Sequence, residues 1–332
     1  MQMPQCKTVR GKASAVQSDR SNQTNRVSGK PKIRVENAYL QRIYQRLSLL
    51  TVLIPVLGTV VAIASLRYFP IGIIEIVLSI VMYAITIFGI EVGFHRYFSH
   101  HAFQTSTPVK AILAMLGSMA AMGGVVFWVA HHRRHHQYSD LTGDPHSPAL
   151  HGDSIGNKFQ GLWHAHLGWT LTGEISNSTL FAKDLLQDPI IAQINRWQQV
   201  WVIIGLAVPA IADGLLTGTW LGVFQGFIWG GLVRIFLGHQ LYWTTNSLCH
   251  VYGDRPFAVD DDSSNNFWLA IPSWGQSWHN NHHAFPNSAT MALEKWQLDP
   301  GIWMLRVLEL MGLVWQIKVP TAKQIKAKKS AS

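Results

Sequence analysis

The sequence predicts an all-α membrane protein in which four transmembrane helices form two hairpins beneath a cytoplasmic helical cap. Three observations support this fold class. Only 14% of the 332 residues are charged and 48% are hydrophobic, whereas a soluble domain carries about 25% charged residues. Four segments approach the roughly 20 apolar residues that a spanning helix requires. Nine histidines gather at the ends of long apolar segments.

The individual elements follow from how apolar and basic residues alternate along the chain. Residues 1–36 are polar, basic and poor in acids, which predicts a disordered tail, although a plastid transit peptide has a similar composition. A short amphipathic segment (37–47) leads into the first hairpin. The predicted spans are about Ser48–Leu66, Pro70–Phe94, Gln198–Leu216 and Thr219–Leu241. The Gly-, Ala- and Met-rich stretch Val109–Ala130 is interpreted as one interfacial or re-entrant helix. Residues 37–315 form one domain, and residues 316–332 form a basic C-terminal tail.

Basic charge is concentrated at both ends of the chain. Residues 1–47 hold ten Lys or Arg against two acids, and the C-terminal tail is rich in lysine. Because Lys and Arg mark the cytoplasmic side of membrane proteins, both termini are predicted to be cytoplasmic, which requires an even number of spans. This charge lies beside spans, so it suits anionic lipid headgroups better than nucleic acid. Cys6 and Cys249 are the only cysteines, and they imply no disulfide framework.

The histidines form three clusters and a singlet. They are His95-Arg-Tyr-Phe-Ser-His100, His132-Arg-Arg-His135-His136, His279-Asn-Asn-His282-His283 and His250. In the second and third clusters, positions i, i+3 and i+4 share one helix face. His95 and His100 are five apart, about 140° around an ideal helix, so they converge only if the helix end unwinds or the rings reach round. Imidazole is the commonest transition-metal ligand, and so many rings predict a site for two ions.

The ligand type narrows the choice of metal. Nine imidazoles without clustered cysteines suit iron or zinc. Structural zinc sites use four ligands and favour cysteine, so the surplus of histidines favours a redox-active pair. One alternative to a dedicated metal site is that these are surface histidines that bind metal only incidentally. A zinc transporter or metal-binding receptor is another, but a transporter holds its ligands near the middle of the bilayer, whereas these lie toward one side.

The clusters resemble those of a known family. HRYFSH, HHRRHH and WHNNHHAFP, at residues 95–100, 131–136 and 278–286, resemble the three histidine boxes of the membrane fatty-acid desaturases, and within them the stearoyl-type Δ9 branch. Asn246-Ser247-x-x-His250-x-x-Gly253 resembles the asparagine and extra histidine of that branch. Leu-Gly-Trp at 167–169 and Gly143-Asp-Pro-His146 are further landmarks. The resemblance covers about residues 40–315.

This resemblance implies a cytoplasmic cap that holds two non-haem irons, with O₂ as co-substrate. The implied ligands are the nine histidines His95, His100, His132, His135, His136, His250, His279, His282 and His283, with Asn246 bound through a water. One departure is His131, which stands where the animal enzymes carry an acid and receives a surface or supporting role. The implied reaction places a cis Δ9 double bond in a saturated acyl chain of sixteen or eighteen carbons.

A substrate tunnel is expected beside the metals, because only fixed placement of the chain can select one of many similar methylenes. Trp128 lies one helical turn before His132, and Tyr242 and Trp243 lie just before Asn246. Tyr242 replaces the family's threonine at the bend of the chain. Counting back from the first box places the closed tunnel end at Tyr83 and Ile87, which would favour sixteen carbons.

Seven histidines remain, and each is expected to be an ordinary polar or interface residue. They are His101, His131, His146, His151, His164, His166 and His239. Arg234 lies inside a predicted span, where a charge requires a partner or a water-filled route. Glu75, Glu91 and Asp213 are the candidate acids, and we expect a structural ion pair, with Glu91 tested first.

Several choices stay open at this stage. A related hydroxylase or ketolase would share the metal centre, and product analysis separates these reactions. No dinucleotide-binding or haem motif is present, so electrons come from a separate carrier, which the resemblance implies to be ferredoxin or cytochrome b5. The acyl chain could be carried by a glycerolipid, coenzyme A or a carrier protein. A compact chain without a fused cytochrome domain favours a bacterial or cyanobacterial acyl-lipid enzyme in the plasma or thylakoid membrane.

Overall fold

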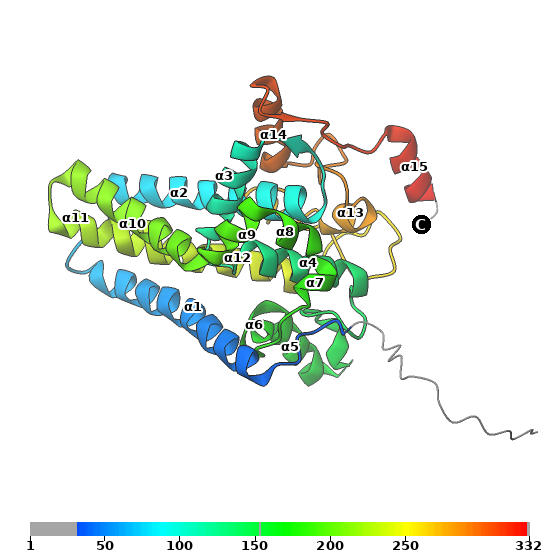
Figure 1. Cartoon of the computed structure of the whole chain (residues 1–332), viewed down its shortest axis with the longest axis horizontal. Helices are drawn as coiled ribbons and strands as arrows, with labels where there is room; N and C mark the ends of the chain where they lie inside the picture. The colour runs from blue at the N-terminus through cyan, green and yellow to red at the C-terminus, as the bar shows by residue number, and fades with distance from the viewer. Residues whose placement is uncertain (1–31, 153, 331–332) are drawn as a thin grey trace, which may run out of the picture. The chain divides into compact units, whose positions relative to one another are not determined.

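The computed structural model describes residues 32–152 and 154–330. Almost all of the predicted disordered tail lies outside the described residues. Within the described residues, four helices are long and apolar enough to cross a membrane, namely Ala38–Ser65, Ile73–Ser99, Gln198–Thr217 and Trp220–Leu248. The predicted all-helical membrane fold with four spans is therefore confirmed. The spans gather at one end in Figure 1, and the shorter helices form a cap at the other end.

Two of the spans are built from more than one kind of helix. The first is α1 (Ala38–Ser65), which absorbs the predicted amphipathic segment and begins at the capping side chain of Asn37. The second joins α2 (Ile73–Phe88) to the π-helical turn η1 (Gly89–Ser99). The third is α10 (Gln198–Thr217). The fourth runs through α11 (Trp220–Gln225), the π-helical η4 (Gly226–Val233) and α12 (Arg234–Leu248).

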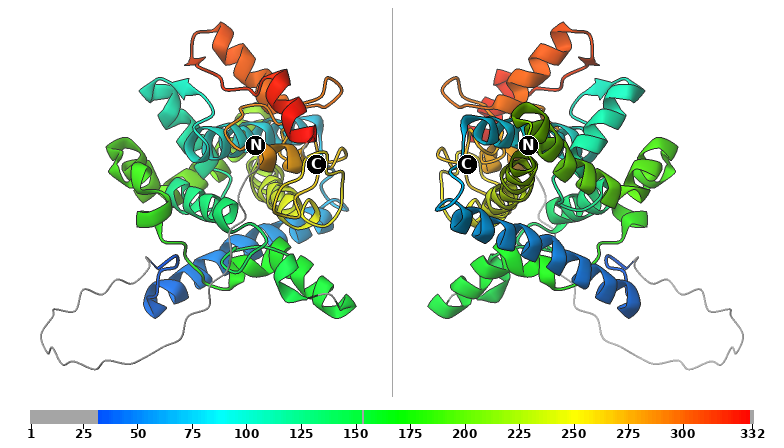
Figure 2. Two further views of the ribbon diagram at one scale, coloured as in Figure 1. Left: turned by 90° about the vertical axis from the view of Figure 1, so that its right-hand side faces the viewer. Right: turned by 90° about the vertical axis from the view of Figure 1, so that its left-hand side faces the viewer.

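The fourth span is the centre of the bundle, because α1, α2 and α10 all pack against η4. Gly58 allows the close approach of α1, since a Cβ at this position would lie 2.4 Å from Leu232. Gly230 meets Pro209 of α10 in the same way. The fourth span therefore lies between α1 and α2, the two helices of the first hairpin. Figure 2 shows α1 at one side of the other spans.

The cap consists of short helices from two stretches of the chain. Between the hairpins lie α3 (Thr107–Ser118), α4 (Val125–Tyr138), η2 (Ala149–His151), α5 (Ile155–Trp163), η3 (His164–Gly168), α6 (Trp169–Leu171), α7 (Ser178–Phe181), α8 (Lys183–Gln187) and α9 (Pro189–Arg196). After the fourth span come α13 (His279–Ala284), α14 (Pro300–Leu310) and α15 (Ala322–Ser330). The strands β1 (Gln104–Thr105) and β2 (Val314–Trp315) pair antiparallel and tie the two stretches together.

The expected single helix over Val109–Ala130 is wrong. The structure has two helices, α3 and α4, separated by residues 119–124. Ala121 and Gly123 have φ values of 59° and 91° in this connection, a left-handed conformation that cannot continue a right-handed helix. The break lets α4 begin anew at Val125 and carry the second histidine cluster.

The expected ion pair of Arg234 is also wrong. In the described part of the chain its guanidinium donates to the carbonyls of Gly230, Met119 and Gly205, at 3.2, 3.0 and 2.8 Å, and meets no carboxylate. Pro209 has no N–H, so the helix leaves the Gly205 carbonyl four residues earlier without its usual donor. Arg234 fills that vacancy and ties α12 to α10 and to the end of α3.

Candidate metal centre and acyl cavity

The π-helical turn η1 resolves the spacing of the first histidine pair. His100 N–H donates to the carbonyl of His95 at 3.2 Å, which is the i→i+5 bond of a π-helix. This wider turn brings residues five apart onto one side, and the two imidazole rings lie 4.9 Å apart. The rings converge because the helix widens at its end, rather than because they reach round an ideal helix.

The structure brings all nine predicted ligand histidines together in two groups. The five-histidine cluster comprises His95, His100, His132, His136 and His282, and the four-histidine cluster comprises His135, His250, His279 and His283. Within each group the candidate ligand atoms lie within 4.8 Å of one another. Helices α4 and α13 each contribute to both groups, because neighbouring residues on each helix, His135 and His136 on α4 and His282 and His283 on α13, belong to different groups.

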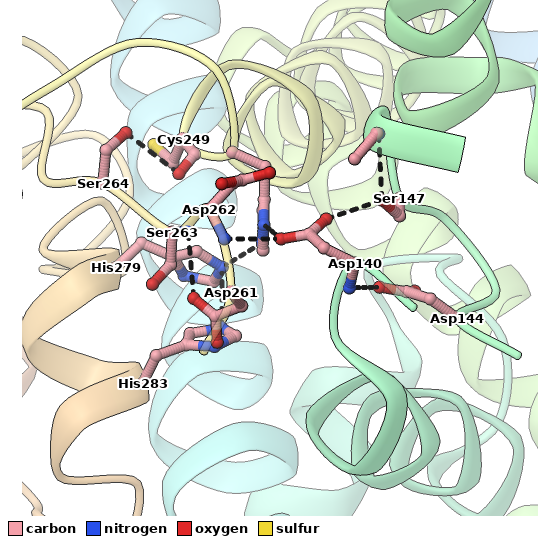
Figure 3. Close-up of polar contacts among 12 residues, drawn as sticks. Asp140, Asp144, Ser147, Cys249, Asp261, Asp262, Ser263, Ser264, His279 and His283 are labelled. Carbon is pink, nitrogen blue, oxygen red and sulfur yellow. Dashed lines mark hydrogen bonds and ion pairs between the residues drawn. The ribbon is translucent and has the colours of Figure 1, made fainter. Parts of the chain in front are cut away.

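Carboxylates orient four of these rings through their Nδ1 atoms. Glu91 contacts His95 at 3.2 Å and Asp144 contacts His135 at 3.0 Å. Asp140 contacts His250 at 2.8 Å, and Asp261 contacts His283 at 2.6 Å. Asp140 and Asp261 approach the four-histidine cluster from different loops in Figure 3. A carboxylate on Nδ1 fixes the tautomer and leaves Nε2 for a metal.

The Nε2 atoms face one another at distances that suit a shared cation. Five Nε2–Nε2 separations in the two clusters lie between 2.8 and 3.1 Å. Metal–nitrogen bonds of about 2.0–2.1 Å place two ligands at right angles about 2.9 Å apart. The donor atoms are therefore spaced as neighbouring ligands of one ion.

The tautomers of the four-histidine cluster support the same conclusion. His250 and His283 give their Nδ1 protons to Asp140 and Asp261, so each Nε2 carries a lone pair. Both lone pairs face Nε2 of His279, at 3.0 and 3.1 Å. One nitrogen can donate only one proton, so hydrogen bonding satisfies at most one of these contacts. A cation bound by all three nitrogens satisfies both.

Burial keeps most of the cap histidines in the neutral form that binds metal. It lowers the pKa of His100 to about 3 and the pKa of His283 to about 4. It also holds the pKa of His279 well below the usual value of 6.5. His135 is different: burial alone lowers its pKa, but the charge and hydrogen bond of Asp144, together with the charges of Asp140 and Asp261, outweigh burial, so the pKa is raised.

A large cavity of about 470 Å³ adjoins the histidine clusters, within the usual size range of ligand sites. Its wall near the clusters includes His132, Asn246, Trp128, Tyr242 and Trp243. The last three were predicted to line the substrate tunnel, and all three line this cavity. The indole of Trp128 stacks on the His132 ring at 4.9 Å and 22°. The buried Nδ2 of Asn246 has no hydrogen-bond partner among the described residues.

The predicted tunnel end does not coincide with this cavity. Tyr83 and Ile87 are absent from its lining. The Tyr83 hydroxyl donates to the carbonyl of Pro272 at 2.8 Å, and the Ile87 side chain is buried near Gly238. Their role in chain length stays a prediction without support from the cavity. Along the fourth span, the end of the cavity that is farthest from Asn246 is lined by Leu232, together with Leu206 of α10.

The remaining histidines differ in their surroundings. His131, His146 and His239 are buried and line the cavity. His146 stacks on the His135 ring at 4.4 Å, so it is closer to the metal centre than its expected role suggested. His101 is exposed and contacts Arg133, while His166 contacts Gln240 and Ser247. The rings of His151 and His164 pack together at 5.1 Å.

Comparison with known proteins decides the family. Residues 72–300 match the family model described as "Fatty acid desaturase". The chain belongs to the fatty acid desaturase family. This membership favours a membrane oxidoreductase that acts on acyl chains over the metal transporter considered from the sequence. The two histidine groups are consistent with the non-haem di-iron centre of such desaturases.

Relatives of this desaturase have different named substrates. The chain is 48% identical to "Hex-5-enoyl-[acyl-carrier protein] acetylenase" of Moorena producens (strain JHB), over 90% of this chain and 93% of the relative. It is 35% identical to "sn-1 stearoyl-lipid 9-desaturase" of Anabaena variabilis, over 71% and 80%. It is 33% identical to "Delta-9 acyl-lipid desaturase 1" of Arabidopsis thaliana, over 74% and 76%.

The carboxylates were the functional residues that histidine spacing alone missed. Glu91 lies four residues before His95, the ring that it contacts, and this spacing is a usable signal because positions four apart share a helix face. Asp140 lies beyond the end of α4 and contacts His250, so no local spacing predicts its partner. Asp261 belongs to an acidic run at 260–262, and its partner His283 is distant in sequence. That pairing depends on the fold of the loop.

Proposed function

We propose that this desaturase introduces a cis Δ9 double bond into a saturated acyl chain of sixteen or eighteen carbons. The nine histidines would hold two irons, which supply an oxidant formed from O₂ that is strong enough for an unactivated methylene. Removal of two hydrogens, with two electrons and two protons from outside, reduces O₂ to two waters. The observation that carries this proposal is that the five-histidine cluster meets a long, mainly apolar cavity through His132, which lines it.

The length of the cavity supports a long chain. On α12 its lining runs from Asn246 back to Ile235, eleven steps along the helix that rise about 16 Å. An acyl chain of sixteen or eighteen carbons extends seven to nine bonds beyond C9, about 9–11 Å at roughly 1.25 Å per bond. This tail fits beside α12, with the reacting carbons next to the clusters.

The residues of the site have separate roles in this proposal. Trp128 packs against His132 and forms one wall at the reacting carbons, with Tyr242 5.7 Å from Trp128 on the opposite helix. The amide of Asn246 would hold a water on one iron. The four carboxylates hold their imidazoles in the ligand tautomer. The apolar wall excludes bulk water from the oxidant.

A second candidate function comes from the acetylenase relative. Its printed name describes an enzyme that acts on a hex-5-enoyl chain on an acyl carrier protein, and the identity of 48% covers nearly both chains. A six-carbon chain that reacts at carbons 5 and 6 leaves nothing to occupy the cavity beyond the clusters. The long apolar cavity therefore favours the long-chain substrate. A hydroxylase or ketolase would share the metals and differ only in the product.

The orientation and partners are part of the same proposal. Both termini and the cap would face the cytoplasm of a bacterial cell, in the plasma or thylakoid membrane. An external one-electron carrier of the ferredoxin or cytochrome b5 type would supply the electrons. The basic residues near the C-terminus, including Lys323 in α15, support an acidic carrier by charge complementarity.

Expression in a host without unsaturated lipids tests the reaction directly. Fatty acids are assigned by double-bond position and by headgroup, with the His279→Ala variant as the inactive control. Δ9-unsaturated C16 or C18 chains that depend on His279 are the expected result. A triple bond or a terminal short-chain product would favour the acetylenase function, and a hydroxyl or keto group would favour oxygen insertion.

A further inference from the structure

The large cavity reaches the outside of the bundle between two spans. Its lining on α1 includes Leu47, Leu50 and Ile54. These side chains are also 44%, 52% and 48% exposed, although they belong to a candidate membrane span. On α10 the lining includes Val202 and the exposed Gln199. The cavity is therefore open to the outside between α1 and α10, along part of two candidate membrane spans.

Contacts of α1 frame this opening at both ends. At the cap end, the Tyr44 ring packs on Phe127 at 4.6 Å, and Gln45 Nε2 donates to the Leu171 carbonyl at 2.8 Å. At the other end, Gly58 closes on Leu232 and Ala62 is buried against η4. Figure 1 shows α1 inclined to the other spans and diverging from them toward the cap. The segment between these contacts, Leu47–Pro55, forms one side of a window about 12 Å long.

We propose that this window admits the substrate's acyl chain sideways from the bilayer, so that the chain is presented by a membrane lipid. This inference rests on the proposed long-chain desaturase function and names the carrier of its substrate. A chain that leaves the bilayer through the window stays in apolar surroundings until it reaches the clusters. A chain delivered by a soluble carrier protein would have no need of an opening at this depth.

The chemistry of the window suits an alkyl chain. Its rim on α1 is mainly Leu, Val and Ile, with Ser48 and Thr51 as the polar exceptions. Thr51 donates its hydroxyl proton to the carbonyl of Leu47 at 2.9 Å, so its polar group is satisfied within the helix. Most polar groups of the cavity, including His131 and His146, lie toward the cap. His239 on α12 donates from Nε2 to the backbone carbonyl of Ala121 at 3.1 Å and is satisfied there. The lipid ester would remain at the polar end while the tail fills the apolar end.

Photolabelling in vesicles tests the window without turnover. The metal-free protein is reconstituted in phosphatidylcholine–phosphatidylglycerol vesicles that contain phosphatidylglycerol with a diazirine midway along its sn-1 stearoyl chain. The labelled peptides are mapped after illumination. Labelling of the interior segment around Trp243 and Asn246 is the expected result. Labelling confined to outward-facing residues such as Ile63 would overturn the proposal.

A matched pair of variants on α1 gives the control. Leu50→Trp fills the window, whereas Leu49→Trp adds the same bulk at an exposed position outside the cavity lining. Leu50→Trp is expected to reduce interior labelling at least about fivefold, since overpacking costs 1–3 kcal/mol, and Leu49→Trp should leave it unchanged. Equal labelling in both variants would refute the window.

A second blocking variant and a second probe separate the remaining explanations. Val202→Trp closes the window from α10, so a folding defect in Leu50→Trp alone cannot decide the outcome. If a diazirine acyl chain on a soluble acyl carrier protein labels the interior while the lipid probe does not, the bilayer route is wrong. If the lipid probe labels the interior but the active protein makes no double bond, the window stands and the proposed function fails.

Discussion

Replacement of Asp261 tests how the loop carboxylates support the metal centre. Asp261 accepts a 2.6 Å hydrogen bond from Nδ1 of His283, and the side chain of His283 is only 2% exposed. Loss of a carboxylate that orients a ligand imidazole typically lowers metal affinity 10–100-fold, about 1.4–2.7 kcal/mol. Asp261→Asn keeps an acceptor but loses the charge, so we expect about tenfold weaker binding. Asp261→Ala loses both, so we expect about 100-fold.

The assay is competition of the purified protein with a chromophoric chelator for Zn²⁺, followed by Fe²⁺ under anaerobic conditions. Asp260→Asn is the matched control, because Asp260 is the exposed neighbour in the same acidic run. The four-histidine cluster should lose affinity in the Asp261 variants, while the five-histidine cluster keeps its own. Wild-type affinity at both sites in Asp261→Ala would refute the idea that this carboxylate holds His283 in the ligand tautomer.

Three further predictions follow from the same structure. His279→Ala should abolish double-bond formation while His101→Ala and His151→Ala retain it, as lipid analysis of expressing cells can check; full activity of His279→Ala would contradict the site. Reporter fusions at the N-terminus, Arg67, Thr217 and the C-terminus should read in, out, out, in, and an external reading near His151 would contradict a single cytoplasmic cap. The metal-free protein should lose stability as the pH falls below about 6.5. The reason is that histidines of the unfolded chain take up protons there, whereas burial keeps the pKa of folded histidines such as His279 lower. A melting temperature that is unchanged between pH 7 and pH 5 would contradict this.

The histidine pattern predicted which residues meet, but not how they divide. His132, His135 and His136 share one face of α4, as their spacing indicates, yet His135 joins a different cluster from the other two. That division depends on where η1 and α13 approach α4, and such tertiary contacts leave no trace in local spacing. The widening of η1, which brings His95 to His100, likewise depends on its packing, since Gly89 lies directly against Gly117 of α3.

Composition located all four spans but gave no account of their arrangement. A sequence reading treats Arg234 as a buried charge that requires an acid, and the structure supplies three carbonyls instead. The carbonyl of Gly205 is available only because Pro209 lacks an N–H, and this relation becomes visible once α10 and α12 are known to touch. The opening beside α1 could not be predicted from the sequence either, because Leu49 and Leu50 are the same residue type in the same apolar run. Only the structure shows that Leu50 lines the cavity and Leu49 does not.

Iron content per chain is the most direct test of two separate metal sites built from nine histidines. Anaerobically purified protein is loaded with Fe²⁺, freed of excess metal, and measured for iron and protein. Two irons per chain are predicted for the wild type. At most about one is predicted for His136→Ala, in the five-histidine cluster, and for His250→Ala, in the four-histidine cluster. A single iron in the wild type, or two irons retained in both variants, would contradict the account.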